Sequence, residues 1–579
     1  MVDLVRTGMD VPMPRSCAST LAPPTSAPPL PSLPQPPPLG LDEEEDAALT
    51  PTAGWPPRSR QGTDQLLVDI AEYVVGFKGV SKEAIKTARY AISDAIGCGI
   101  LALNSPECCK LVGPLVPGVR VENGCHVPGT DFCLDPMQAA FSISTMNRWL
   151  DYNDTWLAAE WSHPSDCLGA VLAVAEHVSR VRVARGLPSL MMQDVILSLI
   201  KAYEIQGLLS LENSMNQIGV DHSLFLRVAC AAVATHLLGG GRREVVNAVS
   251  HAFVDGAGLR SFRHYPNVGS RKGWAAGDTA ARAVFLALLT MKGEMGQDLV
   301  LSAPVWGFNV VFFRRAELAL KRDFGSYIME NVLFKAQFPV EYHAVTAVEA
   351  ALRLHPQVVH RLDEIHSISI SSTRSCIRCI DKTGPLRNFA DRDHCLQYAV
   401  AIALLYGTLT QEHYSDAVAQ DPRIDAVRKK MNVLENPQYS ADYMDPDKRS
   451  ITNAVQVHFQ DRTSTPKVEV EFPVGHRRRR LECFPTLEKK LLRNLLTKFS
   501  ANHAGRIFEV CTDPQMLDIT TVVDFMDLLR LPTVPYVLPP MRSLRLEPLG
   551  LADKENTSGA EEEDGAAKLG DALLGLTPR

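Results

Sequence analysis

The chain has 579 residues, of which 46% are hydrophobic and 22% charged, and a formal net charge of −7. This composition is typical of globular domains, and the negative charge excludes a protein whose main role is to bind nucleic acid through a basic surface. No apolar run reaches the roughly 18 residues of a membrane-spanning helix, and thirteen cysteines are too sparse for a disulfide scaffold. We expect a soluble, intracellular protein that acts on a small molecule or on another protein.

The two ends of the chain differ in composition from its middle. Fourteen of the 39 prolines lie in residues 1–57, which also contain the acidic run 42–46. Proline fixes φ and lacks an N–H donor, and nothing in this stretch is periodic, so residues 1–62 are predicted to be a disordered tail or a proline-motif ligand. Residues 536–579, with the acidic run 561–564, are predicted to be a flexible acidic tail.

The middle of the chain begins with helical patterns. Ser81 is the expected N-cap of a first helix in which Ile85, Ala88, Ile92 and Ile96 recur at helical spacing. Similar apolar periodicity predicts further helices over 168–180, 190–209, 222–238, 243–256 and 275–292. Several of these segments are rich in alanine and apolar nearly all round, which is typical of helices buried in a large bundle.

The pattern changes after about residue 331. Alternating apolar residues predict strands over 364–370, 454–460 and 467–473, the last two joined as a hairpin through 461–466. A helix is predicted over 486–500. The fold class is therefore mainly α, with a large all-helical domain plus a smaller α+β domain. We place the boundaries at 63–331 for the helical domain, 332–482 for the α+β domain, and 483–535 for a return to the helical domain.

The densest polar cluster in the apolar region is RWLDYNDTWLAAEWSHPSD, residues 148–166. Carboxylates that orient a histidine, among tryptophans that exclude water, suit acid/base chemistry. A capped helix junction packed by tryptophan would give the same composition. The polar residues of this cluster are Asp151, Asn153, Asp154, Glu160, His163 and Asp166.

A second cluster, residues 261–278, places cations just before the small-residue helix start GWAAGD. Cations beside the amides of a helix N-terminus favour carboxylates or phosphates, although the spacing of a Walker loop is absent. An exposed basic loop is the alternative. The cations are Arg263, His264, Arg271 and Lys272.

Other candidates lie near predicted helix starts. Lys335, Glu341 and His343 fall where the two predicted domains meet, a common place for a ligand site. Alternatively, each is a satisfied surface, capping or core residue. Two further helix starts carry the remaining candidates, which are His222 in DHS and Asp391, Arg392, Asp393, His394 and Tyr398 in DRDHCLQY.

Two motifs are weak evidence for other functions. Cys376 and Cys379 have the CxxC spacing of metal ligands, but one pair lacks the further thiolates that a zinc site or an iron–sulfur cluster requires. The run GHRRRR at 475–480 is more typical of a solvated edge than of a targeting or nucleic-acid patch. We therefore expect no metal and no cofactor.

The chain resembles the MmgE/PrpD family from about residue 64 to about residue 500, and within it the 2-methylcitrate dehydratases rather than the cis-aconitate decarboxylases. The strings that carry the resemblance are RWLDYNDTWLAAEWSHPSD, SHAFVDGAGLRSFRHYPNVGSRKGWAAGD, ENVLFKAQFPVEYHA, IDKTGPLRNFADRDHCLQY and DPRIDAVRKKM followed by ADYMDPDKRSITNA. The resemblance implies a helical domain with an α+β lid, an active site between them, and usually a homodimer. It also implies metal-free dehydration of 2-methylcitrate to 2-methyl-cis-aconitate in the methylcitrate cycle of propionate breakdown.

The resemblance assigns catalytic positions to Asp154, His163, His222, Lys272, Lys335, His343 and Tyr398, with Asp151 as a competing choice for the first acid. Water elimination needs cations that hold carboxylates, a base, and an acid for the leaving hydroxyl. Arg263, Arg271 and Asp151 are expected to bind substrate, with Lys272 and Lys335 as further cations. His163, oriented by Asp154, is expected to be the base or the acid. Tyr398 or His343 would be its complement, and which group takes which role stays open.

Two other functions compete with this one. One is decarboxylation of cis-aconitate to itaconate on the same scaffold, and the other is a non-catalytic scaffold that binds partners through the proline-rich tail. The expected partner is a small tricarboxylate, with no nucleic acid and no membrane. The family role implies the mitochondrial matrix, but Asp3 and Asp10 beside Arg6 and Arg15 make a poor presequence, so the cytoplasm is the alternative compartment.

Overall fold

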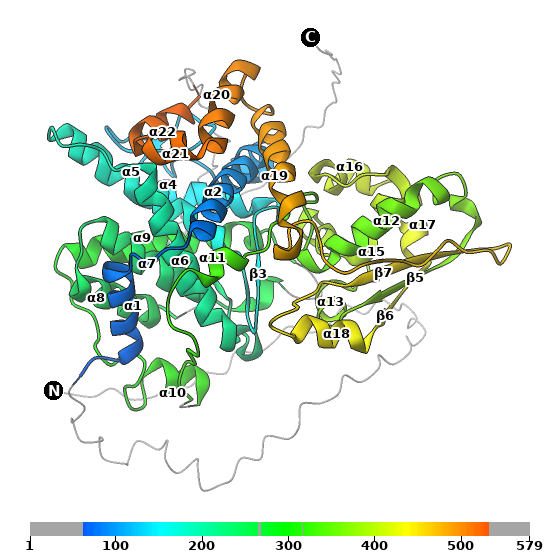
Figure 1. Cartoon of the computed structure of the whole chain (residues 1–579), viewed down its shortest axis with the longest axis horizontal. Helices are drawn as coiled ribbons and strands as arrows, with labels where there is room; N and C mark the ends of the chain where they lie inside the picture. Colours follow the sequence, from blue (N-terminus) through cyan, green and yellow to red (C-terminus); the bar gives the residue numbers. More distant parts are fainter. Residues whose placement is uncertain (1–61, 257, 264–267, 315, 532–579) are drawn as a thin grey trace, which may run out of the picture. The chain divides into compact units, whose positions relative to one another are not determined.

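A computed structural model describes residues 62–256, 258–263, 268–314 and 316–531 (Figure 1). The two predicted tails lie outside these residues, apart from Gly62, and so does His264. Within the described residues, no helix has both the length and the apolar composition needed to cross a lipid bilayer.

The first part of the chain is helical, with short two-residue strands between helices. Ser81 caps the second helix as predicted, since its side chain accepts a hydrogen bond from Ala84 N. The elements are α1 (Gln65–Gly76), α2 (Lys82–Ala102), α3 (Pro106–Cys109), β1 (Cys125–His126), β2 (Cys133–Leu134), α4 (Pro136–Trp149), β3 (Trp156–Leu157), β4 (Trp161–Ser162), α5 (Leu168–Ala184), α6 (Met192–Glu212), α7 (Ser223–Leu237), α8 (Arg242–Val254), α9 (Arg271–Met291), α10 (Phe308–Phe313) and α11 (Tyr327–Asn331).

Helix α4 lies in the middle of this bundle, in contact with α5 and α9. Glycines make the contacts close. A Cβ added at Gly277 of α9 would lie 2.1 Å from Thr145 Oγ1, and one added at Gly169 of α5 would lie 2.3 Å from Ser144 Oγ. Both partners belong to α4, so the position of its C-terminal end, where Arg148 lies, is fixed by tight packing.

The second part of the chain is α+β. In the described residues its sheet has four strands in the order β6-β5-β7-β8, with β5 parallel to β6 and antiparallel to β7. Helix α12 packs on β7 and β8, and α15 packs on α12 (Figure 1). The elements are α12 (Val345–Val358), β5 (Ile365–Ser372), α13 (Arg374–Ile380), α14 (Phe389–Arg392), α15 (Leu396–Tyr406), α16 (Asp416–Ala419), α17 (Pro422–Arg428), β6 (Met431–Glu435), α18 (Pro437–Met444), β7 (Asn453–Phe459) and β8 (Val468–Val470).

The last helices return to the first bundle, as Figure 1 shows in orange. Helix α19 packs on α2, and α22 packs on α5. The four helices are α19 (Arg480–Leu495), α20 (Ala501–Thr512), α21 (Pro514–Ile519) and α22 (Val522–Leu528).

The described residues form two hydrophobic cores. The first joins side chains between Leu67 and Ala336 with those between Val474 and Leu529, and the second lies mainly between Leu333 and Val470. Leu157 of β3 belongs to the second core although its neighbours in sequence belong to the first. The β3–β4 hairpin is therefore where the two cores meet.

Most predicted elements are confirmed. The five helices predicted between residues 168 and 292 correspond to α5–α9, and the predicted strands correspond to β5, β7 and β8, with β7 and β8 paired as a hairpin. Strand β6 was missed because MNVLE is short and follows no clear alternation. The mainly α fold class is confirmed, whereas the predicted domain boundaries remain a proposal.

We predict that a chain beginning at Gly62 unfolds at the same midpoint temperature as the whole protein. The first core residue is Leu67, and Asp64, which accepts a hydrogen bond from Leu301 N, is retained. Calorimetry of both chains tests this. A control chain that begins at Gly79, and so lacks α1 with its buried Leu67 and Ile70, should lose its cooperative transition. A lower midpoint for the chain from Gly62 would show that the removed residues stabilise the fold.

Candidate active site

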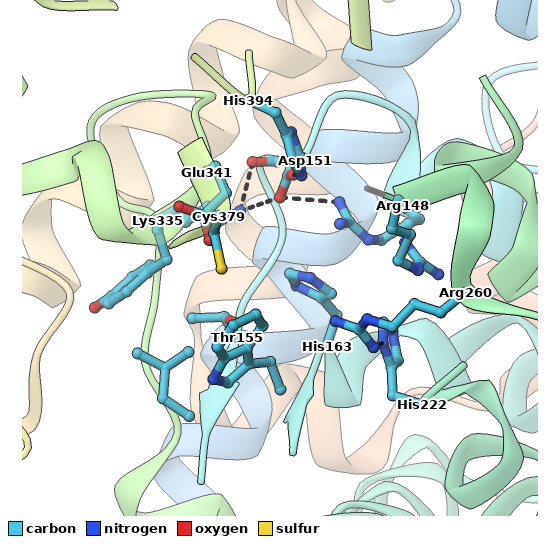
Figure 2. Close-up of a pocket in the computed structure, with 14 residues that line it drawn as sticks. Arg148, Asp151, Thr155, His163, His222, Arg260, Lys335, Glu341, Cys379 and His394 are labelled. Carbon is cyan, nitrogen blue, oxygen red and sulfur yellow. Dashed lines mark hydrogen bonds and ion pairs between the residues drawn. The ribbon is translucent and has the colours of Figure 1, made fainter. Parts of the chain in front are cut away.

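A cavity of about 590 Å³ opens where the two cores meet (Figure 2). Its lining is rich in cations and histidines, which suits a small anionic ligand. The cavity is lined by Arg148, Asp151, Thr155, Leu157, Trp161, His163, His222, Arg260, Arg263, Lys335, Glu341, Tyr342, Cys379 and His394.

The end of α4 brings the first of these residues to the cavity. The helix stops after Trp149, and Asp151 turns the chain with a left-handed backbone, φ 49°. Aspartate is among the few residue types that adopt this conformation at modest cost. The β3–β4 hairpin follows, and Thr155 at its start pairs with Leu333, two residues before Lys335. The turn and the hairpin thus place Arg148, Asp151 and Lys335 side by side.

Asp151 is the centre of a buried ion cluster. Its carboxylate accepts from Lys335 Nζ, lies 2.9 Å from Arg148 Nη1 and lies 3.4 Å from Lys272 Nζ. Lys335 Nζ also donates to the backbone carbonyl of Asp151 at 2.9 Å. Burial alone would raise the pKa of Asp151, but Arg148, Lys335 and Lys272 hold it well below its usual range. Asp151 is therefore an ionised carboxylate that fixes the surrounding cations.

A lysine of the returning helix α19 supports this cluster from behind. Lys490 Nζ donates to the backbone carbonyls of Tyr152 and Lys335 at 2.7 and 3.0 Å, and pairs with Asp94 at 2.7 Å. Two chain segments 183 residues apart are thereby held by one ammonium group. This contact explains how the last helices of the chain contribute to a site that they do not line.

His163 is held as one defined tautomer. Its Nδ1 lies 2.7 Å from the backbone carbonyl of Asp154, an acceptor, so Nδ1 carries the proton and Nε2 keeps its lone pair. Burial lowers the pKa of His163 well below its usual range, and the charges of Arg148 and Lys335 lower it further. A neutral imidazole with a free lone pair is suited to act as a general base.

His222 has the opposite tautomer. Arg260 Nη1 lies 3.3 Å from its Nδ1, and a guanidinium only donates, so Nδ1 is the acceptor and Nε2 carries the proton. Burial lowers the pKa of His222 well below its usual range. Asp221 alone would raise this pKa, and Arg263 and Arg260 lower it. The rings of His163 and His222 lie 6.2 Å apart, so one cavity holds a hydrogen-bond acceptor and a hydrogen-bond donor.

Buried carboxylates hold the arginines of the cavity in place. Arg260 lies 2.9 Å from Glu160, and Arg263 lies 2.6 Å from Asp221. Such pairs restrain the guanidinium groups before a ligand arrives, which lowers the entropy cost of binding.

Asp154 occupies a different position from the one predicted. Its carboxylate accepts hydrogen bonds from Ser165 and from Tyr203, and it orients His163 only through its backbone carbonyl. Burial raises the pKa of Asp154 to about 6. The carboxylate of Asp154 is therefore paired with Ser165 and Tyr203 and does not line the cavity.

Four other predicted residues lie outside the cavity lining. Lys272 is buried behind Asp151 and lies 2.6 Å from Asp393. His343 lies behind Trp161, bonded to Glu341 and Tyr443. Tyr398 donates to the carbonyl of His413 at 2.7 Å, and Arg271 pairs with Asp278 near the surface. The last two side chains have their partners elsewhere on or near α15 and α9 and are absent from the lining.

The structure adds cavity residues that the sequence analysis did not select. Arg148 is part of the first cluster and Arg260 lies three residues before Arg263, so proximity to selected residues was the available signal. His394 was noted among the residues of a helix start but not selected. Cys379 was considered only as a metal ligand, and the structure instead places its thiol in the cavity wall (Figure 2).

One group of the described residues has the composition of a metal site. Ligand atoms of Asp151, Asp393 and His394 lie within 4.8 Å of one another. Arg148, Lys272 and Lys335 already supply positive charge to these carboxylates. A divalent cation placed there would be repelled by its surroundings, so the donor set does not fit a metal.

A larger groove of about 1550 Å³ lies beyond Lys272. Trp149, Phe389 and Tyr414 are among its lining residues, and no histidine of the described chain lines it. The groove therefore lacks the pair of histidines that the smaller cavity contains.

Two family models match the chain: the MmgE/PrpD N-terminal domain over residues 68–321 and the MmgE/PrpD C-terminal domain over residues 338–513. The chain belongs to the MmgE/PrpD family. The MmgE/PrpD N-terminal domain supplies Arg148, His163 and His222 to the cavity, and the C-terminal domain supplies Glu341 and Cys379. Lys335 lies between the two matched regions.

Curated relatives match along nearly their whole length. The 2-methylcitrate dehydratase of Escherichia coli strain K12 is 52% identical over 468 residues, which are 80% of this chain and 97% of that protein. The protein named 2-methylcitrate dehydratase, mitochondrial, of Yarrowia lipolytica is 47% identical over 472 residues, 80% of this chain and 91% of that protein. A probable 2-methylcitrate dehydratase of Saccharomyces cerevisiae is 44% identical over 499 residues, which are 84% of this chain and 96% of that protein.

We predict a pH-dependent effect of the change Asp166→Asn on stability. Burial raises the pKa of Asp166 to about 7, and Arg148 only partly offsets this effect. Between the usual value of about 3.9 and pH 7, the folded protein keeps a proton that the unfolded chain has released. This group's contribution to stability is therefore lost as pH rises through that window.

The variant has no such proton, and its amide oxygen can still accept from Asn153 Nδ2. Its midpoint temperature relative to the wild type should therefore increase from pH 5 to pH 7.5 in calorimetric scans. A difference that stays constant with pH would show that Asp166 is ionised throughout the range.

Proposed function

We propose that the protein eliminates water from 2-methylcitrate to give 2-methyl-cis-aconitate, a hydro-lyase reaction of the methylcitrate cycle in propionate breakdown. The observation that carries the proposal is one cavity in which a neutral His163 lies among Arg148, Arg260 and Lys335. The names of the relatives supply the substrate. Together they favour a tricarboxylate substrate and acid/base elimination.

Each part of the cavity matches a need of this reaction. The substrate carries three carboxylates, and the arginines provide bidentate donors for them. The proton that is removed lies α to a carboxylate, so negative charge develops on that carboxylate in the transition state. Buried guanidinium and ammonium groups held in fixed positions stabilise this charge.

We assign the base role to His163 and the hydrogen bond to the leaving hydroxyl to His222. His163 Nε2 takes the proton from carbon, the electrons of that C–H bond form the double bond, and the C–O bond breaks. The hydroxide that leaves combines with the proton held by His163, which gives one water and restores the neutral imidazole. Tyr398 and His343, the complements expected from sequence, lie outside the cavity lining, which supports His222 in their place.

The alternatives have less support. A decarboxylase on the same scaffold would also need cations and a proton donor, but the three relatives described above are named dehydratases. A non-catalytic scaffold would not require buried charge pairs around an accessible cavity. We keep decarboxylation of cis-aconitate as the second candidate, because the cavity chemistry alone does not separate the two lyases.

We also propose that the protein is a homodimer and that it works in the mitochondrial matrix. Exposed apolar side chains around the end of α8 and around α10 support a subunit interface, since a Cβ at Gly256 would lie 3.6 Å from Phe312 and the two segments are therefore neighbours. They are Val254, Leu259, Trp306 and Val311. The relative from Yarrowia lipolytica, named as mitochondrial, supports the compartment.

The purified protein should convert 2-methylcitrate to 2-methyl-cis-aconitate, with citrate as a poorer substrate, and the rate should be unchanged by EDTA. The positive charges around Asp151 come from side chains, so a chelator should remove nothing that the reaction needs. Mass spectrometry of incubations with 2-methylcitrate, citrate and cis-aconitate distinguishes the candidates. Itaconate from cis-aconitate would support the decarboxylase, and no product from any substrate would support the scaffold.

We predict that His163→Ala lowers kcat by at least about 10²-fold, the usual contribution of a general base. The fold should survive, because the side chain makes one hydrogen bond, to the carbonyl of Asp154. His177→Ala is the matched control, since His177 is a half-buried histidine of α5 outside the cavity lining. A His163→Ala variant with wild-type kcat and an unchanged circular dichroism spectrum would remove His163 from the mechanism.

A further inference from the structure

The cavity is chemically different on its two sides. Figure 2 shows Arg148, Arg260 and His222 on one side, and Thr155, Lys335, Glu341 and Cys379 on the other, with the sulfur of Cys379 pointing into the space between them. The side with the arginines suits the carboxylates of a tricarboxylate. The opposite side therefore has to bind a different part of the substrate.

That opposite side is a surface of the second hydrophobic core. Leu157 and Tyr342 belong to this core, and Trp161 and Cys379 pack against it. Leu157 and Trp161 are direct cross-strand partners in the β3–β4 hairpin, while Cys379 comes from α13. We call Leu157, Trp161, Tyr342 and Cys379 the apolar wall.

The thiol in the apolar wall is uncharged. Burial raises the pKa of Cys379, and the carboxylate of Glu341 raises it further. A neutral thiol behaves as a small apolar group, so Cys379 adds to the wall without an ionic contact.

A negative charge beside the wall disfavours substrate carboxylates there. Burial alone would raise the pKa of Glu341, but the neighbouring His343, His394 and Lys335 lower it to about 2, so this residue is ionised. Glu341 lines the cavity and acts electrostatically on Cys379. A substrate carboxylate placed against the wall would be repelled by Glu341 and would lose hydration to apolar side chains.

We propose that the apolar wall binds the methyl group that distinguishes 2-methylcitrate from citrate, so that Leu157 and Cys379 determine substrate specificity. The inference rests on the proposed dehydratase function. With three carboxylates directed to the arginine side, the methyl is the uncharged substituent left for the wall. Apolar contacts of this kind discriminate one carbon by about 10-fold or more.

The test compares kcat/KM for 2-methylcitrate and for citrate in wild type, Cys379→Leu and Leu157→Ala. Leucine at position 379 fills the space of the methyl group and should lower the 2-methylcitrate to citrate ratio by at least about 10-fold. Leu157→Ala removes a contact to the methyl and should lower the same ratio by about 4-fold, the value of one buried methyl. Where citrate turnover is below detection, the inhibition constant of citrate replaces its kcat/KM.

Arg378→Leu is the matched control, because Arg378 is an exposed residue of the same helix and receives the same new side chain. Its ratio should equal that of the wild type. If folded Cys379→Leu or folded Leu157→Ala lowers both substrates equally, the methyl assignment is wrong while the proposed function stands. If the wild type converts neither substrate, the proposed function itself fails.

Discussion

The site depends on one buried carboxylate. Asp151 is held by three cations of the described chain, and they come from segments far apart in sequence: Arg148 at the end of α4, Lys272 at the start of α9, and Lys335 between the cores. Removing Asp151 would leave Arg148 and Lys335 buried without the carboxylate that pairs with them, at a cost of several kcal/mol. The cluster therefore joins the helical bundle to the α+β part at the point where the cavity opens.

The same cluster sets the acid/base state of the cavity. Positive charge attracts an anionic substrate and, together with burial, keeps His163 neutral before the substrate arrives. A bound tricarboxylate adds negative charge beside His163, which raises its pKa and makes it a stronger base when the substrate is in place. Substrate binding and base strength are thus coupled through one set of charges.

The sequence could predict which elements and which polar residues are present, but not where the fold places each side chain. Helical periodicity located α5 to α9, because buried bundle helices are apolar along most of their length. The polar strings located His163, His222, Lys335 and Asp151, because buried charges stand out in an apolar region. Which face a side chain occupies depends on helix rotation and on packing, so Tyr398 and Arg271 were selected although they do not line the cavity.

Contacts between residues that are far apart in the chain could not be predicted from the sequence either. Arg260 and Cys379 reach the cavity only because α13 and the turn before α9 meet the β3–β4 hairpin. Lys490 stabilises the site through backbone carbonyls, a contact that no side-chain pattern records.

A crystal structure of the protein with 2-methylcitrate bound is the most direct test of the proposed site. We predict that the substrate lies in the cavity lined by His163, with carboxylates on Arg148, Arg260 and Arg263, the acidic C–H facing His163 Nε2, and the methyl against Leu157 and Cys379. A substrate seated instead in the groove lined by Trp149, Phe389 and Tyr414, with no contact to His163, would contradict it.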